Sequence, residues 1–495
     1  MRHLVVLASL ITVTSAAICY ASTLQYTLPV RYLHIQLTDG NGRNLSESSG
    51  ELKITVRGEP SAECRIRRDV VDRFDGTYVV RLKLHTSCER IEVTIKDSEE
   101  RILCGSPIVI GGEGGGANFA LPDRPVLADQ CDCPVQSTQE WFDSHQCDRF
   151  SYNQLHQDLQ QWEKIDFAKV IQRVESSWGH EKRRLSASLC HYKIHNNQIY
   201  RTCYGEYTGF KMFSGEMLLS LSRKMVLPDM DFIMNLGDWP LQERSTDGVP
   251  IVSWCGSDSS MDIVLPTYEL TQSILNSLNT VTLDVHSARG RNGTKWAEKR
   301  PTAVFRGRDS NELRLEVAKL AVDRPDLISG GITRYFFFDK EKHPPAVNHA
   351  SFYEFFKHKY VISIDGTVAA YRLPFLLSGD SVLLKSGSAY YEHFYADLKP
   401  NEHFVPFERV EDLDGLIHDL EEHPERAKKI ISNANQFVLD HLQPLNIFCY
   451  HAKFVLEYSR KLISTSTTIE KMDQVPQKPS NCRCKKSGSS RHNEL

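Results

Sequence analysis

The stretch PDMDFIMNLGDWP occupies residues 228–240. Within it, residues 232–236 form a short apolar run, which is typical of a buried strand. The strand ends at Gly237, and the next residue is a carboxylate, Asp238. Because ligands of open α/β sheets bind beyond the carboxyl ends of the strands, Asp238 is placed to act as a base. The alternative is that Asp238 only begins a turn before Pro240, as aspartate often does.

The second half of the chain alternates strands with helices. Short apolar runs predict the strands, and helical spacing predicts the helices. The predicted strands are 302–305, 360–364 and 381–385, and the predicted helices are 311–322, 367–375, 413–422, 424–441 and 445–462. Asp309 or Ser310 can cap the first of these helices. Repeated strand–helix units predict a parallel, doubly wound sheet.

The middle of the chain, residues 129–300, has a mixed α/β character. Apolar residues follow helical spacing over 152–175, and a further helix is expected over 213–226. Residues 188–205 read as a β-hairpin that turns at Asn196 and Asn197. This region therefore predicts a mixed α/β unit in which the helix 213–226 leads into the Asp238 strand.

Residues 22–128 are expected to form a separate all-β unit. Short strands with alternating polarity are separated by turn residues, which predicts a β-sandwich. The phrases DGTY at 75–78 and GSP at 105–107 resemble the filamin-type immunoglobulin repeat. The glycine-rich residues 111–116 are typical of a flexible linker. Such a unit implies binding or spacing rather than chemistry.

The N-terminus reads as a secretory signal over residues 1–21. Basic residues precede the apolar run 4–13, and small residues follow it, with cleavage expected after Ala17 or Ala21. A run this short does not span a bilayer, and no other stretch of the sequence is long and apolar enough to do so. The mature chain is therefore expected in the secretory pathway without a membrane span.

The C-terminal residues His492–Leu495 resemble the KDEL and HDEL retrieval signals. They predict residence in the lumen of the endoplasmic reticulum (ER) and recognition by the retrieval receptor. The rest of the tail, 464–495, is rich in Ser, Thr and Lys and is expected to be disordered. In that lumen the sequons at Asn44 and Asn292 are candidates for glycosylation.

Cysteine usage agrees with an oxidising compartment. Removing Cys19 with the signal leaves 12 of the 13 cysteines, an even number that predicts disulfides without fixing their connectivity. The pairs Cys131/Cys133 and Cys482/Cys484 are spaced too closely for zinc, whose paired ligands prefer spacings of two to four. No metal site is predicted.

Length, composition and charge limit the classes of protein to which the chain can belong. A chain of 495 residues with 41% hydrophobic and 25% charged residues is an ordinary globular protein of two to four domains. The net charge of -4 gives no electrostatic case for nucleic-acid binding.

Two arginines mark a candidate anion site after the strand 302–305. Arg306 and Arg308 flank Gly307 in a predicted turn that leads into the helix 311–322. Backbone N–H groups and the dipole at a helix N-terminus favour phosphate, and arginine adds planar, bidentate donors. The pattern alone is also compatible with ordinary surface arginines.

Taken in order, three motifs resemble a known family. They are GDWP at 237–240, FRGR at 305–308 and IDGTVAAYR at 364–372. With the helical C-terminus, these motifs are similar to the protein O-glucosyltransferases of glycosyltransferase family 90. The filamin-like repeat and the KDEL-type ending point to the KDEL-motif-containing branch, which acts on Notch-type EGF repeats. The resemblance spans about 135–465 and the N-terminal repeat.

The resemblance implies a multidomain fold: the immunoglobulin-like β-sandwich of filamin type, then a GT-B-like pair of Rossmann-type lobes. The expected boundaries are 1–21, 22–128, an acceptor-side lobe over 129–300, a donor-side lobe over 301–463, and the tail. The implied reaction inverts the anomeric centre and moves glucose from UDP-glucose to a serine of an EGF-like domain.

The resemblance also implies roles for individual residues. Asp238 is the implied catalytic base. The implied donor-binding residues are Arg306, Arg308, Thr367, Val368, Ala369, Ala370, Tyr371 and Arg372. The implied acceptor-binding residues are Thr208, Gly209, Phe210, Lys211, Met212 and Trp239, with 265–270 as a further candidate segment. The family's RDYP and FRGSR differ from GDWP and FRGR here, so Arg308 matches less closely than Arg306.

No metal or other cofactor is expected besides the co-substrate. Arginines can stabilise the UDP leaving group, and Asp229-Met230-Asp231 precedes its strand rather than ending it. Two alternatives remain: a lumenal chaperone or lectin-like binder without turnover, and use of UDP-xylose in place of UDP-glucose. Glycoside hydrolysis is disfavoured because no second carboxylate is predicted to accompany Asp238.

Overall fold

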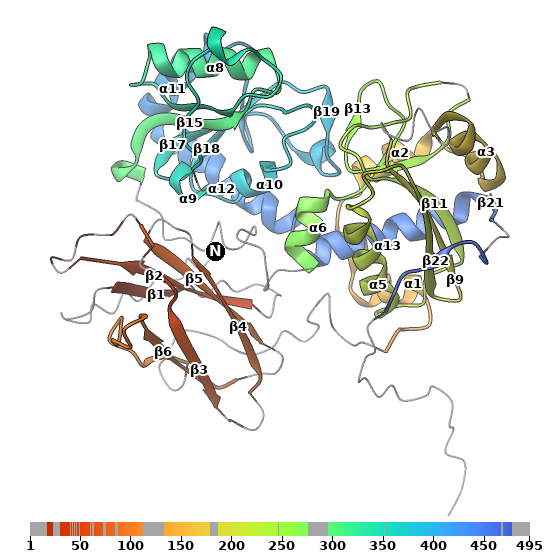
Figure 1. The fold of residues 1–495 in the computed structure, drawn as a ribbon, viewed down its shortest axis with the longest axis horizontal. Helices are drawn as coiled ribbons and strands as arrows, with labels where there is room; N and C mark the ends of the chain where they lie inside the picture. The colour runs from red at the N-terminus through yellow and green to blue at the C-terminus, as the bar shows by residue number, and fades with distance from the viewer. Residues whose placement is uncertain are drawn as a thin grey trace, which may run out of the picture.

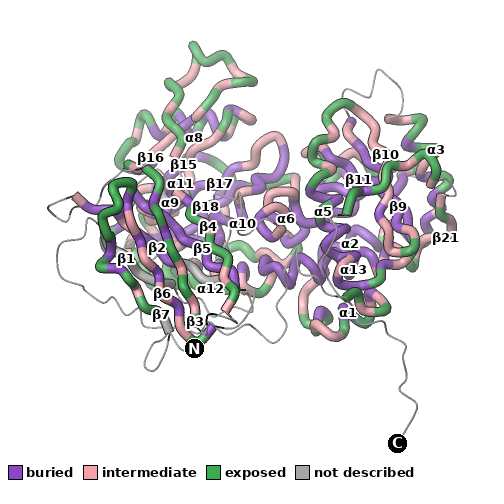
Figure 2. Tube along the Cα trace, turned by 60° about the horizontal axis from the view of Figure 1, so that its bottom comes forward, coloured by how far each residue is buried: buried purple, intermediate pink, exposed green. Residues whose placement is uncertain are grey.

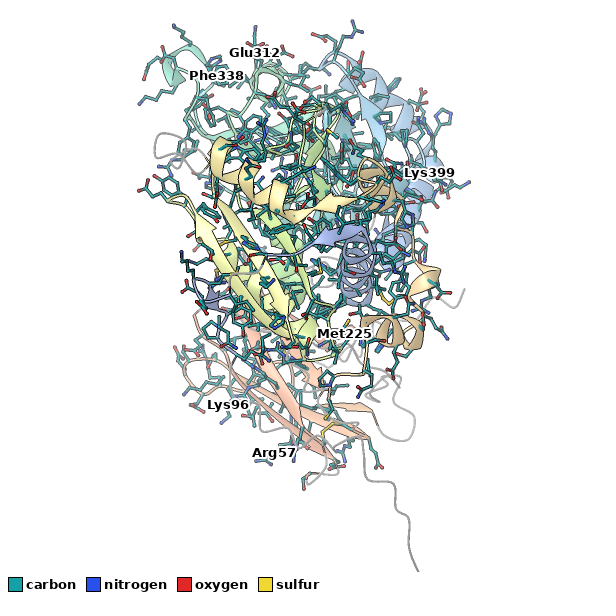
Figure 3. The ribbon with its side chains drawn as sticks, turned by 90° about the vertical axis from the view of Figure 1, so that its right-hand side faces the viewer. Arg57, Lys96, Met225, Glu312, Phe338 and Lys399 are labelled. Atoms are coloured by element: carbon teal, nitrogen blue, oxygen red, sulfur yellow. A yellow bond between two sulfur atoms is a disulfide. The ribbon has the colours of Figure 1, made fainter. Side chains whose placement is uncertain are left out.

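A computed structural model describes residues 17–22, 30–111, 133–178, 187–275, 296–466 and 469–477, apart from 40, 42, 44, 46, 49, 60, 62, 63, 73–75, 85–87, 246 and 351. The described residues form three parts (Figure 1). A β-rich N-terminal unit lies beside two α/β lobes, and long helices near the C-terminus run from one lobe to the other. Arg57 and Lys96 of the β-rich unit lie at the opposite end of the molecule from Glu312 and Phe338 (Figure 3).

The N-terminal unit contains two antiparallel sheets around one core. One sheet has the order β1-β2-β5-β4 and the other β3-β6-β7. Inward-facing residues alternate along β6, where Ile91, Val93 and Ile95 are fully buried. The strands are β1 (Ala17–Ser22), β2 (Val30–Leu37), β3 (Lys53–Glu59), β4 (Ile66–Asp72), β5 (Thr77–Leu84), β6 (Arg90–Lys96) and β7 (Ile108–Gly111). Assignment of this unit to the filamin type stays a prediction.

Strand β1 overlaps the end of the predicted signal peptide. Residues Ala17–Ser22 pair with β2 along the edge of the four-stranded sheet. Cleavage after Ala17 would keep this pairing, whereas cleavage after Ala21 would remove nearly all of it. Residues 1–16 and the linker residues 112–116 lie outside the described part of the chain.

The lobe that follows is built on a six-stranded mixed sheet with the order β14-β12-β11-β9-β10-β22, in which β22 is Asp473–Gln474. The predicted hairpin is confirmed: β9 and β10 pair antiparallel, and Asn196 and Asn197 turn the chain with φ of 50° and 58°. Asparagine tolerates this left-handed backbone better than most residues do. The strands are β9 (Leu189–His195), β10 (Gln198–Tyr204), β11 (Met230–Asn235), β12 (Ile251–Ser253), β13 (Gly256–Ser257) and β14 (Ile263–Val264).

The helices of this lobe depart from the prediction at one place. The helical spacing over 152–175 is interrupted, because β8 (Ile165–Asp166) separates α2 (Asn153–Gln160) from α3 (Phe167–Trp178). The interruption is imposed by pairing of β8 with β21 (Leu462–Ser464), about 300 residues later in sequence. The other helices are α1 (Thr138–Ser144), η1 (Cys147–Arg149), α5 (Lys211–Ser222) and α6 (Tyr268–Leu275).

The second lobe contains the predicted parallel sheet, with the order β16-β15-β17-β18-β20. Alternate residues of each strand enter different cores: Phe305 and Ile362 face one core, while Val304 and Val361 face the other. Both faces of the sheet are therefore covered, by α8 and α11 on one side and by α9, α10 and α12 on the other (Figure 1). The strands are β15 (Arg300–Arg308), β16 (Ile328–Arg334), β17 (His358–Ser363), β18 (Val382–Ser386), β19 (Tyr390–Tyr391) and β20 (Val405–Phe407), and the helices are η2 (Trp296–Glu298), α8 (Glu312–Asp323), η3 (Lys340–Lys342), α9 (Phe352–Phe355), α10 (Leu373–Leu377), η4 (Tyr395–Asp397), α11 (Asp412–Glu422), α12 (Pro424–His441) and α13 (Pro444–Lys461).

Helix α13 follows the second lobe in sequence but packs on the first. It contacts α1 and α2, and the ring of Phe454 meets the edge of Phe232 at 5.5 Å between centroids. A disulfide joins Cys147 to Cys449 across this contact. Figure 2 shows α13 buried along most of its length within the first lobe.

The segment after α13 is ordered over its first part. Strand β21 pairs with β8, and β22 (Asp473–Gln474) extends the six-stranded sheet at β10. The prediction of disorder from residue 464 is therefore wrong for residues 464–466 and 469–477, because this segment supplies strand pairing that no local pattern announces. No helix among the described residues is long and apolar enough to cross a membrane.

Candidate active site

A pocket of about 380 Å³ opens between the two lobes. It lies at the carboxyl ends of β15 and β17, the neighbours between which the strand order of the parallel sheet reverses. Ligands of doubly wound sheets bind at such a switch point. The pocket is lined by Asp238, Glu269, Arg306, Gly307, Arg308, Arg314, Thr333, His349, Ala350, Phe355, Gly366, Thr367, Val368, Ala369, Ala370, Tyr371 and Arg372. The structure thus brings together Asp238 and every residue predicted to bind the donor.

Asp238 follows β11 in a loop whose backbone is held on both sides. The Asn235 side chain donates to the Trp239 carbonyl at 2.6 Å and accepts from the Gly237 N–H at 2.9 Å. Beyond the loop, the buried Asp262 carboxylate accepts the N–H groups of residues 241 and 242 at 2.9 and 2.8 Å. These bonds fix the position from which the Asp238 side chain enters the pocket.

The Asp238 carboxylate keeps unused hydrogen-bonding capacity. Its Oδ1 atom has no hydrogen-bond partner. Burial raises the pKa of Asp238, while a hydrogen bond from Tyr268 and the charge of Arg308 lower it. A carboxylate with a raised pKa that remains ionised is a better proton acceptor than an exposed one.

Arg372 is a largely buried cation of the pocket. Its Nη1 donates to the carbonyl of Arg306, and its guanidinium lies over the Phe305 ring at 5.7 Å. The Nε and Nη2 atoms have no hydrogen-bond partner. Burial lowers the pKa of Arg372 to about 10, which still leaves the group charged at neutral pH. These donors are available to an anionic ligand.

The motif FRGR has a different backbone from the one expected. Arg306–Arg308 are the last residues of strand β15 rather than a glycine turn, and a Cβ at Gly307 would lie 2.9 Å from the Phe305 ring. Arg308 faces the pocket with its guanidinium 5.2 Å from the ring centroid of Phe336.

The start of α8 also differs from the prediction. Asn311, not Asp309 or Ser310, is the N-cap, accepting from the Arg314 N–H at 3.1 Å. Asp309 is instead buried and accepts the backbone N–H groups of residues 336–338. Helix α8 contributes a side chain to the pocket, Arg314, whose pKa burial lowers to about 9. Arg314 was not predicted, because an arginine in a first helical turn is ordinarily solvent-exposed.

The segment 367–372 forms a loop and not the start of a helix. Helix α10 begins at Leu373, with Arg372 as its N-cap. The Tyr371 hydroxyl donates to the Asp238 carbonyl at 3.3 Å, and the Tyr371 ring meets the edge of Tyr268 at 5.4 Å between centroids. These contacts join the donor-side loop to the loop that carries Asp238.

Glu269 brings a second carboxylate into the pocket. It lies in the first turn of α6. Burial and the charge of Asp238 raise the pKa of Glu269, and the charge of Arg372 lowers it. The prediction that no second carboxylate accompanies Asp238 is therefore wrong. The sequence pointed to Glu269 only indirectly, because this residue falls within 265–270, the further candidate segment for acceptor binding.

The predicted acceptor residues lie on the first lobe at the beginning of α5 and beside Asp238. They present apolar surface, since Met212 is 56% exposed and Trp239 is 52% exposed. Phe210 stacks on Tyr268 at 4.5 Å between ring centroids, which links this surface to the tyrosine that bonds Asp238. None of Thr208, Gly209, Phe210, Lys211 and Met212 lines the pocket itself.

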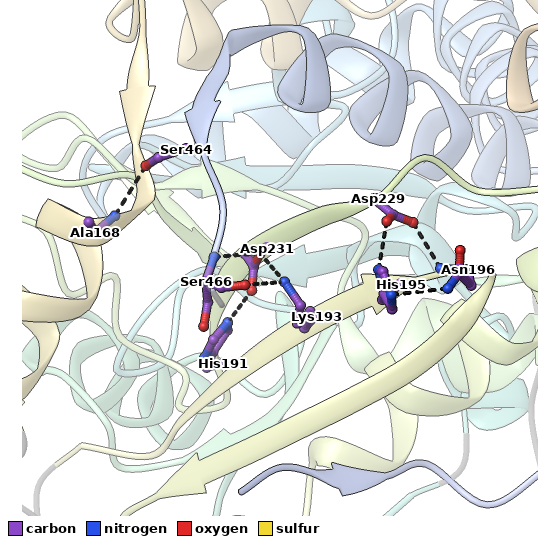
Figure 4. A network of polar contacts seen from close by, with 9 residues as sticks. All are labelled: Ala168, His191, Lys193, His195, Asn196, Asp229, Asp231, Ser464 and Ser466. Carbon is purple, nitrogen blue, oxygen red and sulfur yellow. Dashed lines mark hydrogen bonds and ion pairs between the residues drawn. The ribbon is translucent and has the colours of Figure 1, made fainter. Parts of the chain in front are cut away.

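In the Asp229-Met230-Asp231 motif, both carboxylates are paired with other side chains of the same chain (Figure 4). Asp231 is fully buried and contacts His191 at 2.6 Å and Lys193 at 3.0 Å. Asp229 contacts His195 at 2.7 Å and accepts the Asn196 N–H at 2.9 Å. No group of metal-ligating side chains is found within the described ranges. The sequons at Asn44 and Asn292 and the C-terminal His492–Leu495 lie outside those ranges.

The fold and the pocket define a two-lobed α/β protein with an arginine-lined pocket at the switch point of a parallel sheet, next to a carboxylate. Residues 143–494 match the model of glycosyl transferase family 90. The chain is 40% identical to Protein O-glucosyltransferase 2 of Danio rerio, over 91% of this chain and 88% of that protein. It is 38% identical to Protein O-glucosyltransferase 3 of Homo sapiens, over 94% and 91% of the two chains. With Protein O-glucosyltransferase 1 of Homo sapiens the identity is 25%, over 58% and 76%.

The chain therefore belongs to glycosyl transferase family 90, and its chemistry is the transfer of a sugar.

Proposed function

We propose that this chain is an inverting protein O-glucosyltransferase that moves glucose from UDP-glucose to a serine of an EGF-like domain. The observation that carries the proposal is one pocket in which Asp238 and Arg372 both have polar atoms without partners. The names of the relatives, protein O-glucosyltransferases, support the sugar and the class of acceptor.

The charges of the pocket fit a nucleoside diphosphate. Four guanidinium groups face two carboxylates, an excess of two positive charges. The diphosphate of UDP-glucose carries two negative charges, and the leaving UDP gains further charge at its terminal phosphate. Arginines stabilise that charge as it develops, and no metal is required for this role.

Asp238 is the proposed base of the transfer. As the serine oxygen forms a bond to C1 of glucose, its proton passes to the Asp238 carboxylate. The bond between C1 and the phosphate oxygen breaks, and its electron pair leaves with UDP. A positioned carboxylate contributes about 10²–10⁴-fold to such a step.

The acceptor is proposed to lie across the first lobe, against Met212 and Trp239. Exposed aromatic and methionine side chains are enriched at protein-binding surfaces. The fold proposed for the two lobes is GT-B-like, and that for the N-terminal unit is a filamin-type immunoglobulin sandwich.

The proposed location is the ER lumen. Disulfides join Cys64 to Cys88, Cys147 to Cys449 and Cys190 to Cys203, which favours an oxidising compartment. Cys255 is buried and unpaired, so the described part of the chain does not pair all its cysteines. The signal-like N-terminus and His492–Leu495 support entry and retrieval.

The test incubates purified protein with UDP-glucose or UDP-xylose and with folded or reduced EGF-like domains, with and without EDTA. Intact mass reads the product. We expect one hexose on the folded domain from UDP-glucose, with EDTA having no effect. Pentose transfer alone would favour the UDP-xylose alternative. Binding of the domain without transfer would favour a chaperone.

A further inference from the structure

Glu269 is a charged group of the pocket that the proposed reaction leaves without a role. Its carboxylate accepts no hydrogen bond from any residue that the structure describes. Among the residues that the structure describes, Glu269 is the counter-charge that raises the pKa of Arg372, against the larger lowering by burial. The Glu269 carboxylate lines the pocket without a donor among the described residues, so its two oxygens can accept hydrogen bonds from a ligand.

The position of Glu269 is fixed by its neighbour. Tyr268 bonds Asp238, stacks on Phe210 and meets Tyr371 edge-on, so the first turn of α6 is held from both lobes. Glu269 is therefore presented to the pocket from a rigid element beside the proposed base.

The charge of Glu269 limits which part of the donor it can meet. A carboxylate repels the diphosphate, which the arginines of the parallel-sheet lobe attract. The part of the donor that must approach Asp238 is the sugar, because its C1 is the reacting atom. Sugar hydroxyls are donors, and an ionised carboxylate has two oxygens that only accept.

Building on the proposed function, we infer that Glu269 accepts hydrogen bonds from hydroxyl groups of the donor sugar and so determines which sugar is transferred. The competing explanation is that Glu269 only neutralises Arg372. The two differ in their effect on UDP, which has the phosphates but no sugar.

The test measures the dissociation constants of UDP and UDP-glucose by calorimetry, using intact wild-type protein, Glu269→Gln and the exposed control Glu216→Gln. We expect Glu269→Gln to weaken UDP-glucose about 10- to 100-fold, the loss of hydrogen bonds to a charged group, and to leave UDP within about twofold. The control should change neither value. Equal weakening of UDP and UDP-glucose, or no change in either, would overturn the inference.

A set of deoxy analogues of UDP-glucose then identifies the hydroxyl. The penalty of Glu269→Gln should vanish for the analogue that lacks the hydroxyl bound by Glu269, and a penalty that persists for every analogue would contradict the inference. If Glu269→Gln does not fold, Glu269→Asp keeps the charge and should show the same selective loss. Arg372→Gln separates this result from the proposed function: if it leaves UDP affinity unchanged, UDP does not bind in this pocket and the proposed function fails first.

Discussion

Two groups of charged side chains differ in how completely they are paired. In the first lobe, Asp231 is surrounded by His191, Lys193 and the Ser466 backbone, with contacts of 2.6 to 3.1 Å (Figure 4). In the pocket, Asp238 and Arg372 keep atoms without partners, and Glu269 accepts no hydrogen bond from the described residues.

The difference distinguishes a structural cluster, around Asp231, from a ligand site, around Asp238. A buried carboxylate that is fully paired within the protein has no capacity left for a ligand, and its network fastens the C-terminal segment to the sheet. Unpaired buried polar atoms are unfavourable unless something binds them, so they mark a site. The two aspartates lie seven positions apart in the same strand-and-loop segment, yet they serve different purposes.

Replacing the proposed base should produce the largest effect. We expect Asp238→Asn to lower kcat for transfer about 10²–10⁴-fold, because the amide cannot take the serine proton. UDP affinity and the melting temperature should stay close to those of wild type. The exposed Asp247→Asn serves as the control, and full activity of Asp238→Asn would remove the distinction between the two aspartates.

Substitutions in the paired cluster around Asp231 should lower stability rather than activity. Asp231→Ala leaves Lys193 buried without a counter-charge and should lower the free energy of unfolding by about 3–5 kcal/mol. Asp229→Ala in the same motif removes a half-exposed contact and should cost only about 0–1 kcal/mol. Denaturant titration gives both values, and folded Asp231→Ala should retain its kcat. An Asp231→Ala protein that is stable but inactive would reverse the comparison.

A substitution of Arg372 tests whether the unpaired cation binds UDP. Arg372→Gln should weaken UDP about 10- to 100-fold, since hydrogen bonds to charged groups contribute about 1.5–3 kcal/mol. Arg324→Gln, at the partly exposed C-cap that follows α8, is the control and should bind UDP as wild type does. Calorimetry measures the UDP affinity of both variants. If Arg372→Gln bound UDP as tightly as wild type does, the diphosphate would have to bind elsewhere.

The smallest expected effect is a shift of the pH dependence in Arg308→Gln. A base acts when deprotonated, so kcat/KM rises as the pH increases through the pKa of Asp238. Burial raises that pKa, and the hydrogen bond from Tyr268 and the charge of Arg308 lower it. Arg308→Gln removes one lowering influence, so the acidic limb of the profile should move to higher pH. A limb that moves to lower pH would contradict the assigned base.

The local patterns predicted much of the fold. Alternation and turn residues located the hairpin at Asn196 and Asn197, and apolar runs located β15, β17 and β18 of the parallel sheet but not β16 and β20. The prediction of one continuous helical stretch over 152–175 failed because a strand within it pairs with residues far away in sequence. Strand β8 breaks the helical spacing because β21 pairs with it, and no pattern near residue 166 announces a partner near residue 464.

The site was predicted through its motifs, and the exceptions have a common cause. Asp238, Arg306 and Arg372 stand at strand ends or in a recognisable loop. Arg314 and Glu269 reach the pocket from the first turns of helices, where charged residues are common and ordinarily solvated. Their roles depend on how the lobes meet, which local spacing does not encode.

A crystal structure of Asp238→Asn with UDP-glucose tests the central claim most directly, because the slowed reaction preserves the donor. We predict that the diphosphate lies on Arg306 and Arg372, with the glucose ring between position 238 and Glu269. A donor bound outside this pocket, or a glucose ring turned away from position 238, would contradict it.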